Sequence, residues 1–475
     1  MRVSNVEYKK SILMIFLLLL CVFQMGILWS EKNPGIPFPF INQLSFWKNN
    51  EEHNIDEVKN NYYSANAIIL SDGKEDLCWP LEPSHNLYRS IWKDLQNNYL
   101  RQIIEKKPEL TSGEKLYEHD WYSLIKMKCI IVEFKNPLPK GAIKWLTGAK
   151  DASASPLKEI YKIAIVPYES INNTENTLYV YDGVNIYKYL VNIGSGDMKK
   201  SDYIKAIETI EDNDNVFPMN RLSSYYPSIK NPELLVRMDY SEKRIWDLLL
   251  KTPNEIDFND ENVDMIEEYL REDHRGSMIT KFSEDGTNLI FSDEQQVYRY
   301  YFNGFFDYQY RNKNNGDKGL VEEALEKALI FIENRRKKLI DGVEIHLNKI
   351  NEKPYYYEFI FDYVFEGMEV KIQDRRNQNV QSAITICANR DRVVDVKWYI
   401  KTFAYNDYYD FYSLNFYDFF EKQLIAEYPE YAIVPVFNDI SVIYICPENG
   451  MRAEPYWRVD INSKPIYLKM RGKGE

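Results

Sequence analysis

Residues 355–372 read YYYEFIFDYVFEGMEVKI, and this stretch decides the fold class. Its two halves, 355–365 and 368–372, are rich in the aromatic and β-branched residues that favour strands. Glu366 and Gly367 lie between them and suit the two-residue turn that joins neighbouring antiparallel strands. We therefore predict a β-hairpin here, and with it an antiparallel sheet in the last part of the chain.

A long helix is predicted directly before this hairpin, over residues 320–339. Leu325, Ala328, Leu329 and Ile332 recur at helical spacing and face one way, whereas the Glu, Lys and Arg residues of the segment face water. The rest of the C-terminal part is predicted to contain a strand pair at 382–388 and 392–403, a helix near 414–427, and strands at 440–445, 457–461 and 466–468.

The N-terminal half alternates strand and helix signals in the same way. Strands are predicted at 67–70, 130–134, 160–166, 177–181 and 185–191, the last two as a hairpin across Asp182 and Gly183. A helix over 86–105 carries its apolar stripe on Leu87, Ile91, Leu95, Tyr99 and Ile103. Further helices are predicted at 202–210 and 241–250, and further strands at 277–282, 288–292 and 297–302. The predicted fold class is therefore α+β with mainly antiparallel sheets.

The length of 475 residues is typical of about three domains. Gly194, Ser195 and Gly196 are consecutive flexible residues and indicate one boundary. We predict three extracytoplasmic α+β domains, at 61–195, 196–312 and 313–475. Residues 30–60 carry three prolines and then a polar run, and are expected to form a juxtamembrane linker.

An apolar run at residues 12–29 predicts a single transmembrane helix. No charged residue lies between Lys10 and Glu31, and a helix of this length rises roughly 27 Å, close to the thickness of a hydrocarbon core. The basic excess precedes the run, which predicts a cytoplasmic tail at 1–11 and places the rest of the chain outside the cell membrane. A cleavable signal peptide is one alternative, but the sequence lacks a small-x-small cleavage site. A lipid anchor on Cys21 is another, although Leu20 stands where a small residue is expected.

One face of the predicted transmembrane helix is a candidate contact surface. Leu17, Cys21, Gln24 and Leu28 are spaced to share that face. The Gln24 amide is costly to bury in lipid without a partner, so a neighbouring helix that hydrogen-bonds it would be favoured. We predict these four residues as a partner-binding site. The alternative is that Gln24 reaches the outer headgroup region, about 7.5 Å further along the helix.

Composition and motifs argue against several function classes. Residues 1–32 hold four of the 59 basic and two of the 72 acidic residues, so the remainder has a net charge of −15, which disfavours nucleic acid as a partner. The sequence contains no GxSxG or HExxH motif, and its five histidines stand singly, without a second ligand at metal-binding spacing. We therefore predict no catalytic residues, metal or cofactor, and no enzyme, although the paired carboxylates of a glycosidase would meet only in the fold.

Cysteine and aromatic residues carry two further expectations. The four cysteines beyond the anchor are an even set, which permits disulfides and also fits buried free thiols. They are Cys78, Cys129, Cys387 and Cys446. Aromatic residues at 405, 408, 409, 412, 416, 419 and 420 fall on one helical face, which predicts a stripe packed in a core or a subunit interface.

The order of these features resembles the YycH family. The anchor is followed by AIILSDG (67–73), LYRSIWKDL (87–95), IIVEFKNPLP (130–139), LYVYDG (178–183), RIWDLLLKTPNEI (244–256) and KFSEDGTNLIFSD (281–293). The last part resembles the companion protein YycI in FDYVFEGMEV (361–370), DVKWYIK (395–401) and EPYWRVDI (454–461).

YycH-family proteins are membrane-anchored regulators of the essential sensor histidine kinase that controls cell-wall metabolism in low-GC Gram-positive bacteria. The resemblance implies a binding or regulatory role without catalysis. It also implies two partners in the same membrane, a kinase of the WalK (YycG) type and a YycI-like protein. The alternative from another class is a membrane-anchored exported enzyme that acts on cell-wall polymer.

Overall fold

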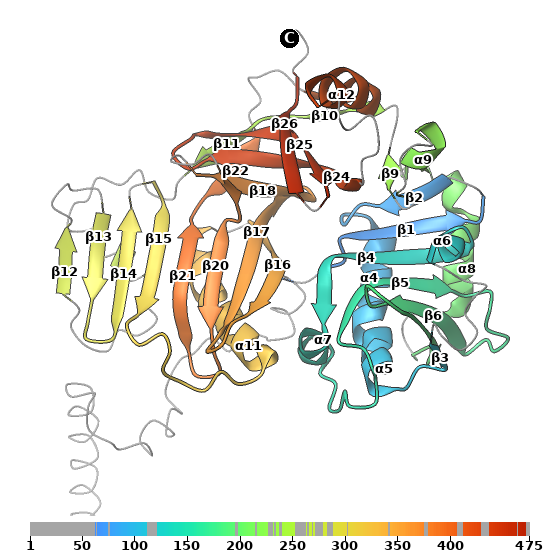
Figure 1. Cartoon of the computed structure of the whole chain (residues 1–475), viewed down its shortest axis with the longest axis horizontal. Coiled ribbons are helices and arrows are strands. Elements are labelled where there is room, and N and C mark those ends of the chain that lie inside the picture. Colours follow the sequence, from blue (N-terminus) through green and yellow to red (C-terminus); the bar gives the residue numbers. More distant parts are fainter. Residues whose placement is uncertain are drawn as a thin grey trace, which may run out of the picture.

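The structure is a computed structural model of the whole chain (Figure 1). It describes residues 62, 64–74, 77–111, 121–194, 198–213, 216–226, 231, 234–236, 240–251, 263, 266–267, 269–270, 279–282, 288–301, 303–340, 343–374, 379–405, 412–428, 437–462 and 464–471. The predicted tail, transmembrane helix and linker at 1–11, 12–29 and 30–60 lie outside these residues. No helix within the described ranges is long and apolar enough to cross a membrane.

A nine-stranded sheet forms the N-terminal unit. In spatial order its strands are β3 (Leu110–Thr111), β7 (Ile186–Asn192), β6 (Glu175–Tyr181), β5 (Glu159–Val166), β4 (Lys128–Pro139), β1 (Ala67–Asp72), β2 (Leu77–Leu81), β8 (Met219–Arg221) and β9 (Leu235–Val236). The strands are antiparallel throughout. The predicted hairpin is confirmed as β6 and β7, with Gly183 at φ +93° in the turn.

Helices cover both faces of this sheet. They are α4 (Asn86–Asp94), the π-helix η1 (Leu95–Tyr99), α5 (Leu100–Glu105), α6 (Trp121–Ile125), α7 (Lys140–Thr147), α8 (Lys200–Glu208), the 3-10 helix η3 (Ile210–Asp212) and α9 (Leu222–Tyr225). The helix predicted at 86–105 is confirmed as α4, η1 and α5 in succession, and most of its apolar stripe is buried. That stripe packs on Ile68, Leu70 and Val132, whereas α6 packs on the opposite face against Ile69 and Ile131.

A fifteen-stranded sheet forms the C-terminal unit. Its path runs β12 (Ile279–Phe282), β13 (Asn288–Ser292), β14 (Gln296–Tyr301), β15 (Phe305–Tyr310), β21 (Val393–Tyr399), β20 (Ile384–Ala388), β17 (Tyr357–Phe365), β18 (Met368–Gln373), β24 (Phe437–Pro447), β25 (Arg452–Ile461), β11 (Leu248–Lys251) and β22 (Thr402–Tyr405). Three strands lie off this path: β16 (Glu344–Glu352) on β17, β19 (Val380–Gln381) on β18, and β26 (Lys464–Lys469) on β25. Only the β18–β24 pairing is parallel in this sheet, as far as the structure describes it. The fold is thus α+β with mainly antiparallel sheets, as predicted.

The remaining described elements pack around this sheet. They are α11 (Val321–Leu339), the π-helix η4 (Asp418–Leu424), α12 (Ile425–Glu427), and the two-stranded sheet of β10 (Tyr240–Ile245) and β23 (Tyr412–Leu414). α11 contacts β17, β20 and β21. The predicted hairpin at 355–372 is confirmed as β17 and β18, and both Glu366 and Gly367 have positive φ in its turn, as a type I′ turn requires.

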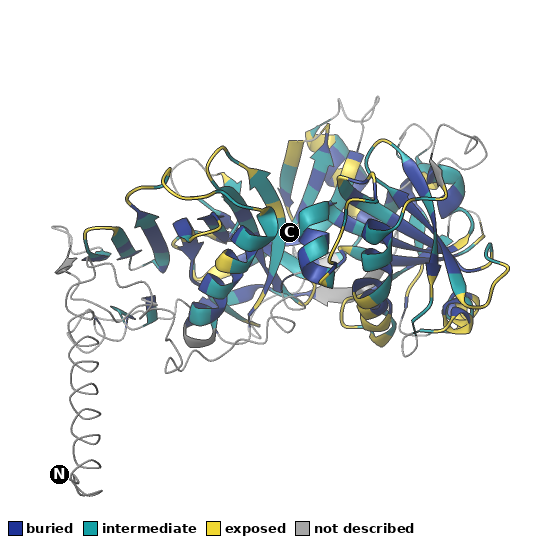
Figure 2. Cartoon of the chain, turned by 90° about the horizontal axis from the view of Figure 1, so that it is seen from below, coloured by how far each residue is buried: buried dark blue, intermediate teal, exposed yellow. Residues whose placement is uncertain are grey.

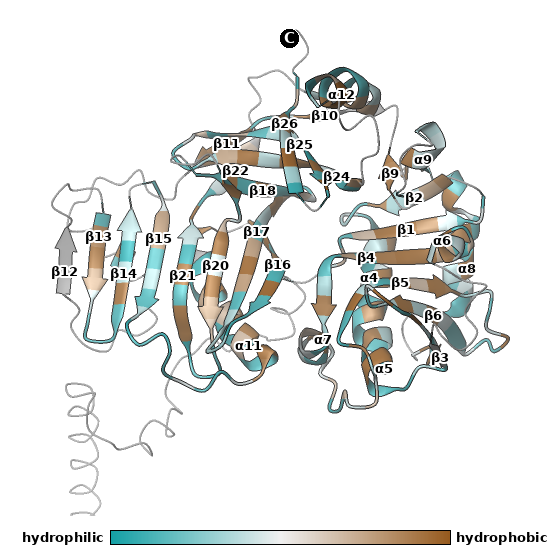
Figure 3. Cartoon of the chain, in the orientation of Figure 1, coloured by the Kyte–Doolittle hydropathy of each residue, from teal (hydrophilic) through white to brown (hydrophobic). Residues whose placement is uncertain are grey.

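Burial follows the hydropathy of the strands. Figure 2 shows buried residues along the middle of both sheets, and Figure 3 shows hydrophobic residues concentrated in β4, β5 and β6. In the C-terminal unit the buried Trp398 indole donates a 2.7 Å hydrogen bond to Tyr363, whose hydroxyl in turn donates to the Tyr399 carbonyl at 2.7 Å. The four cysteines Cys78, Cys129, Cys387 and Cys446 are buried free thiols.

Three expectations from the sequence are wrong. The helix predicted at 241–250 is instead the strands β10 and β11, because Leu248 and Leu250 alternate inward where β11 pairs with β22 and β25. The stripe from 405 to 420 is not one helix, since Tyr405 ends β22 and Tyr412 begins β23. Its buried members do pack in a core; they are Tyr412, Phe416, Phe419 and Phe420. The charged face of α11 is not wholly solvated, because Arg335 is 1% exposed and donates to the Leu270 carbonyl.

Residues of the predicted middle domain contribute to both units. β8 and β9 extend the N-terminal sheet, whereas β12 to β15 join β21 in the C-terminal sheet, as the yellow and orange strands of Figure 1 show. Strand pairing therefore links this segment to its neighbours on both sides. The division into three domains at 195 and 312 stays a prediction.

Candidate functional site: a charged seam between the two units

The two units meet along a seam formed by β4 and α7 on one side and by β16, β18 and α11 on the other. β4 contacts β16, and α7 contacts α11. Gly141 allows the two helices to approach closely, because a Cβ atom there would overlap with Cγ1 of Val321. Lys144 and Glu322 form a 3.4 Å ion pair beside this contact. The seam is therefore a close-packed interface that joins distant parts of the chain.

Polar contacts cross the seam from the irregular stretch of β4 between Glu133 and Leu138. Lys135 forms an ion pair with Glu369 of β18. The next residue, Asn136, donates a 2.5 Å hydrogen bond from Nδ2 to Oδ1 of Asn348 in β16. The β4 register shift between Glu133 and Leu138 frees this stretch from β5, so its side chains are available to the C-terminal unit.

Behind Glu369 the C-terminal unit holds a cluster of buried and half-buried charges. Lys371 forms an ion pair with Asp362, and its Nζ lies 3.8 Å from Glu369. Arg458 contacts Asp460 at 2.6 Å and Glu369 at 3.8 Å. The C-terminal side of this site is therefore acidic, and the N-terminal unit supplies an additional cation. The carboxylates on the C-terminal side are Asp362, Glu369, Asp439 and Asp460, and the cations on that side are Lys371 and Arg458.

These neighbours shift the protonation equilibria of the cluster. Burial would raise the pKa of Glu369, but Lys135, Lys371 and Arg458 outweigh it and lower the pKa to about 2. Burial lowers the pKa of Lys135, against the opposing attraction of Glu369. Burial also raises the pKa of Asp439, which Lys135 opposes. The state of Glu369 therefore depends on a cation contributed by the other unit.

A cavity of about 90 Å³ lies at this point of the seam. Pro83, Asn136, His346, Asp362 and Gly367 are among its lining residues. A second, mainly apolar cavity of about 250 Å³ lies outside these seam elements, between the β2 and β9 end of the N-terminal sheet and strands β24 and β25; its lining includes Leu81, Leu235, Phe416, Val442 and Trp457.

The first cavity also contains a serine, a histidine and a glutamate, but they do not form a catalytic triad. Ser64 Oγ lies 3.4 Å from His346 Nδ1, and His346 Nε2 lies 3.9 Å from the exposed Glu344 carboxylate. At 3.9 Å the carboxylate makes no hydrogen bond that could orient the ring. Burial lowers the pKa of His346, which keeps the ring neutral near pH 7. The geometry is that of a packed interface.

The site predicted from the sequence lies elsewhere in the chain. Leu17, Cys21, Gln24 and Leu28 are outside the described residues. No cluster of three or more His, Cys, Asp or Glu side chains suited to a metal ion occurs within the part of the chain that the structure describes. The seam residues were missed because Lys135 and Glu369 belong to strands in different units. One local signal did exist, since Asp362 and Lys371 lie between apolar residues at buried positions of their strands.

Comparison with solved structures defines the class of fold. The crystal structure of YycH from Bacillus subtilis matches with a TM-score of 0.55 at 13% sequence identity, covering 86% of this chain and 96% of that one. An uncharacterized protein from Eubacterium rectale matches with a TM-score of 0.33 at 12% identity, over 51% of this chain and 88% of that one. No protein-family model and no curated protein matches the sequence.

The chain therefore has a YycH-like fold, which confirms the predicted resemblance at the level of structure. The match extends over both units described above.

Proposed function

We propose that the chain is a membrane-anchored extracytoplasmic regulator without catalytic activity, which binds and modulates a sensor histidine kinase of the WalK type together with a YycI-like protein. The observation that supports this most strongly is the YycH-like fold over 86% of the chain. The seam is consistent with a binding role, because the carboxylates at its centre are paired with cations and are not poised for acid–base chemistry.

The proposed topology has residues 1–11 in the cytoplasm and 30–475 outside the cell, because of the charges that flank the apolar run. A protease added to intact protoplasts is expected to degrade nearly the whole chain, while a cytoplasmic marker survives. Persistence of the folded part under conditions that digest a known external protein would reject this orientation.

Crosslinking from the predicted transmembrane helix is expected to detect the kinase partnership. Single cysteines at positions 17, 21, 24 and 28 should crosslink to the kinase or the YycI-like protein, and cysteines at 19, 22 and 26 should not, because the first set shares one helical face. Cys21 must be replaced in the other variants, whereas the four buried thiols can remain. Mass spectrometry of products formed in native membranes identifies the partner.

This experiment separates the two parts of the proposal. Failure to recover either partner at any position argues against the regulatory function. Recovery with equal efficiency around the helix would retain the partner and reject the predicted face. The alternative function, an exported cell-wall hydrolase, would gain support if purified protein cleaved peptidoglycan and lost that activity on mutation of a single carboxylate.

A further inference from the structure

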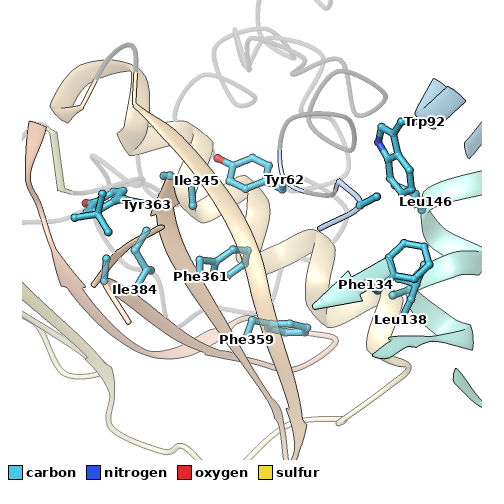
Figure 4. Close-up of a cluster of buried hydrophobic side chains, with 14 of the residues drawn as sticks. Tyr62, Trp92, Phe134, Leu138, Leu146, Ile345, Phe359, Phe361, Tyr363 and Ile384 are labelled. Atoms are coloured by element: carbon cyan, nitrogen blue, oxygen red, sulfur yellow. The ribbon is translucent and has the colours of Figure 1, made fainter. Parts of the chain in front are cut away.

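The first described residue, Tyr62, packs on the unit that is last in the sequence. Its side chain is 1% exposed, and its ring centroid lies 6.1 Å from that of Phe361 in β17, in an edge-on arrangement. The Arg336 guanidinium of α11 lies 5.8 Å from the ring centroid. Figure 4 shows the Tyr62 ring on the side of the cluster that holds Ile345 and Phe361, whereas Trp92 and Phe134 lie on the side of the N-terminal unit.

The electrostatic surroundings of Tyr62 also come from α11. Burial raises the pKa of its hydroxyl, and the nearby Glu333 carboxylate raises it further against the influence of Arg336. Ser64 Oγ then lies 3.4 Å from His346 of β16. The described part of the chain therefore begins with contacts to the C-terminal unit.

The chain crosses the seam within the next two residues. The Ala65 carbonyl accepts a hydrogen bond from the Tyr88 hydroxyl of α4, and the Asn66 amide donates to the Glu133 carbonyl of β4 at 2.8 Å. β1 follows from Ala67 in the middle of the N-terminal sheet. Residues 62–66 thus connect to the C-terminal unit at one end and to the N-terminal unit at the other.

Segments near the start of a folded region are usually poorly ordered unless they are tied down. Here Tyr62 is held by the C-terminal unit, although the next strand, β1, belongs to the N-terminal sheet. Release of the Tyr62 contact would therefore act on the seam through residues 64–66.

We propose that Tyr62 is a tether latch: it fixes the membrane-proximal end of the fold to the C-terminal unit and holds the seam closed. Residues 1–61 provide the tether, so this inference rests on the anchor in the proposed function. Release of the Tyr62 ring from Phe361 and Arg336 loosens the contact between β4 and β16. The latch couples the position of the anchor to the relative position of the two units.

Amide hydrogen exchange of the full-length protein in detergent micelles tests the latch. Tyr62→Ala is expected to increase exchange about tenfold in β16 and in residues 134–139 of β4, while β6 and β7 keep their protection. Tyr62→Phe keeps the ring and should change exchange less than about twofold. Tyr168→Ala removes an exposed tyrosine of the N-terminal unit and is the matched control.

A second variant opens the seam from its other end. Gly141→Leu forces a side chain into the space of Val321 and should raise exchange in the same two segments. The latch is overturned if Tyr62→Ala affects only residues 64–72, or if it raises exchange equally throughout both sheets. The measurement needs no kinase and no oriented membrane, so its failure is distinguishable from failure of the topology or the crosslinking experiment.

Discussion

Lys135→Glu is expected to lower the free energy of unfolding by about 2–4 kcal/mol and to separate the two units. The substitution places a carboxylate against Glu369 and close to Asp439, where the C-terminal side already carries more carboxylates than cations. Breaking a buried ion pair by changing one partner typically costs about 3–5 kcal/mol. The Lys135 side chain retains 24% exposure and that of Glu369 retains 18%, so solvent screening reduces the effect.

The matched control for this substitution is Lys162→Glu. Lys162 forms a 3.2 Å ion pair with Glu133 on the N-terminal sheet, and its side chain is 22% exposed, but the pair lies within one unit. A loss of about 1 kcal/mol is expected there, as for a partly exposed pair. Guanidinium unfolding gives the two stabilities, and small-angle scattering gives the separation of the units. Equal losses for the two variants, with unchanged scattering, would contradict a special role for Lys135.

Elements with a local pattern of apolar residues or a clear turn could be predicted from the sequence. The helix predicted at 320–339 is found at Val321–Leu339, because Leu325, Ala328 and Ile332 recur within three turns and need only one apolar surface to cover them. The hairpin at 355–372 was equally accessible, because Glu366 and Gly367 provide a turn that fixes its register.

Elements that depend on pairing with distant parts of the chain could not be predicted from the sequence. Residues 241–250 have the leucine content of a helix, but β11 lies between β22 and β25, both of which come much later in the chain. Tertiary pairing of this kind overrides local propensity. The π-helices η1 and η4 lie within segments correctly predicted as helical, but the apolar spacing of those segments does not distinguish a π-helix from an α-helix.

The candidate site depends entirely on such distant contacts. Lys135 directly follows the strand predicted at 130–134 and lies within β4, and nothing in the sequence around it indicates Glu369 as its partner. Tyr62 precedes the first strand and falls in the first predicted domain at 61–195, whereas its side chain packs on the C-terminal unit. The charged residues inside apolar strands, Asp362 and Lys371, were the available signal, because a charge in a buried strand requires a partner.

Glu369→Gln is expected to remove a large part of the acid sensitivity of the fold. The pKa of Glu369 is about 2 in the folded protein, against an ordinary value of 4.5. Because the folded-state pKa is lowered, the ionised carboxylate stabilises the fold above about pH 4.5, and this contribution is lost as the pH falls toward 2. A shift of this size corresponds to about 3 kcal/mol. The wild-type free energy of unfolding should therefore fall more steeply than that of the variant across this window.

The pKa of Asp439 is shifted in the opposite direction, so the wild-type pH profile must be compared with that of the Glu369→Gln variant. Burial raises the pKa of Asp439, so its contribution to stability is present at low pH and is lost as the pH rises through its folded pKa, which partly masks Glu369 in the wild type. Subtracting the curve of the Glu369→Gln variant from the wild-type curve cancels this background.

Glu344→Gln, at an exposed position in the same cavity, is the control and should leave the slope unchanged. Parallel curves for wild type and Glu369→Gln between pH 4.5 and about 2 would mean that the seam cations do not hold Glu369 ionised. The two units would then be joined mainly by the apolar contacts around Tyr62 and by the close packing of α7 on α11.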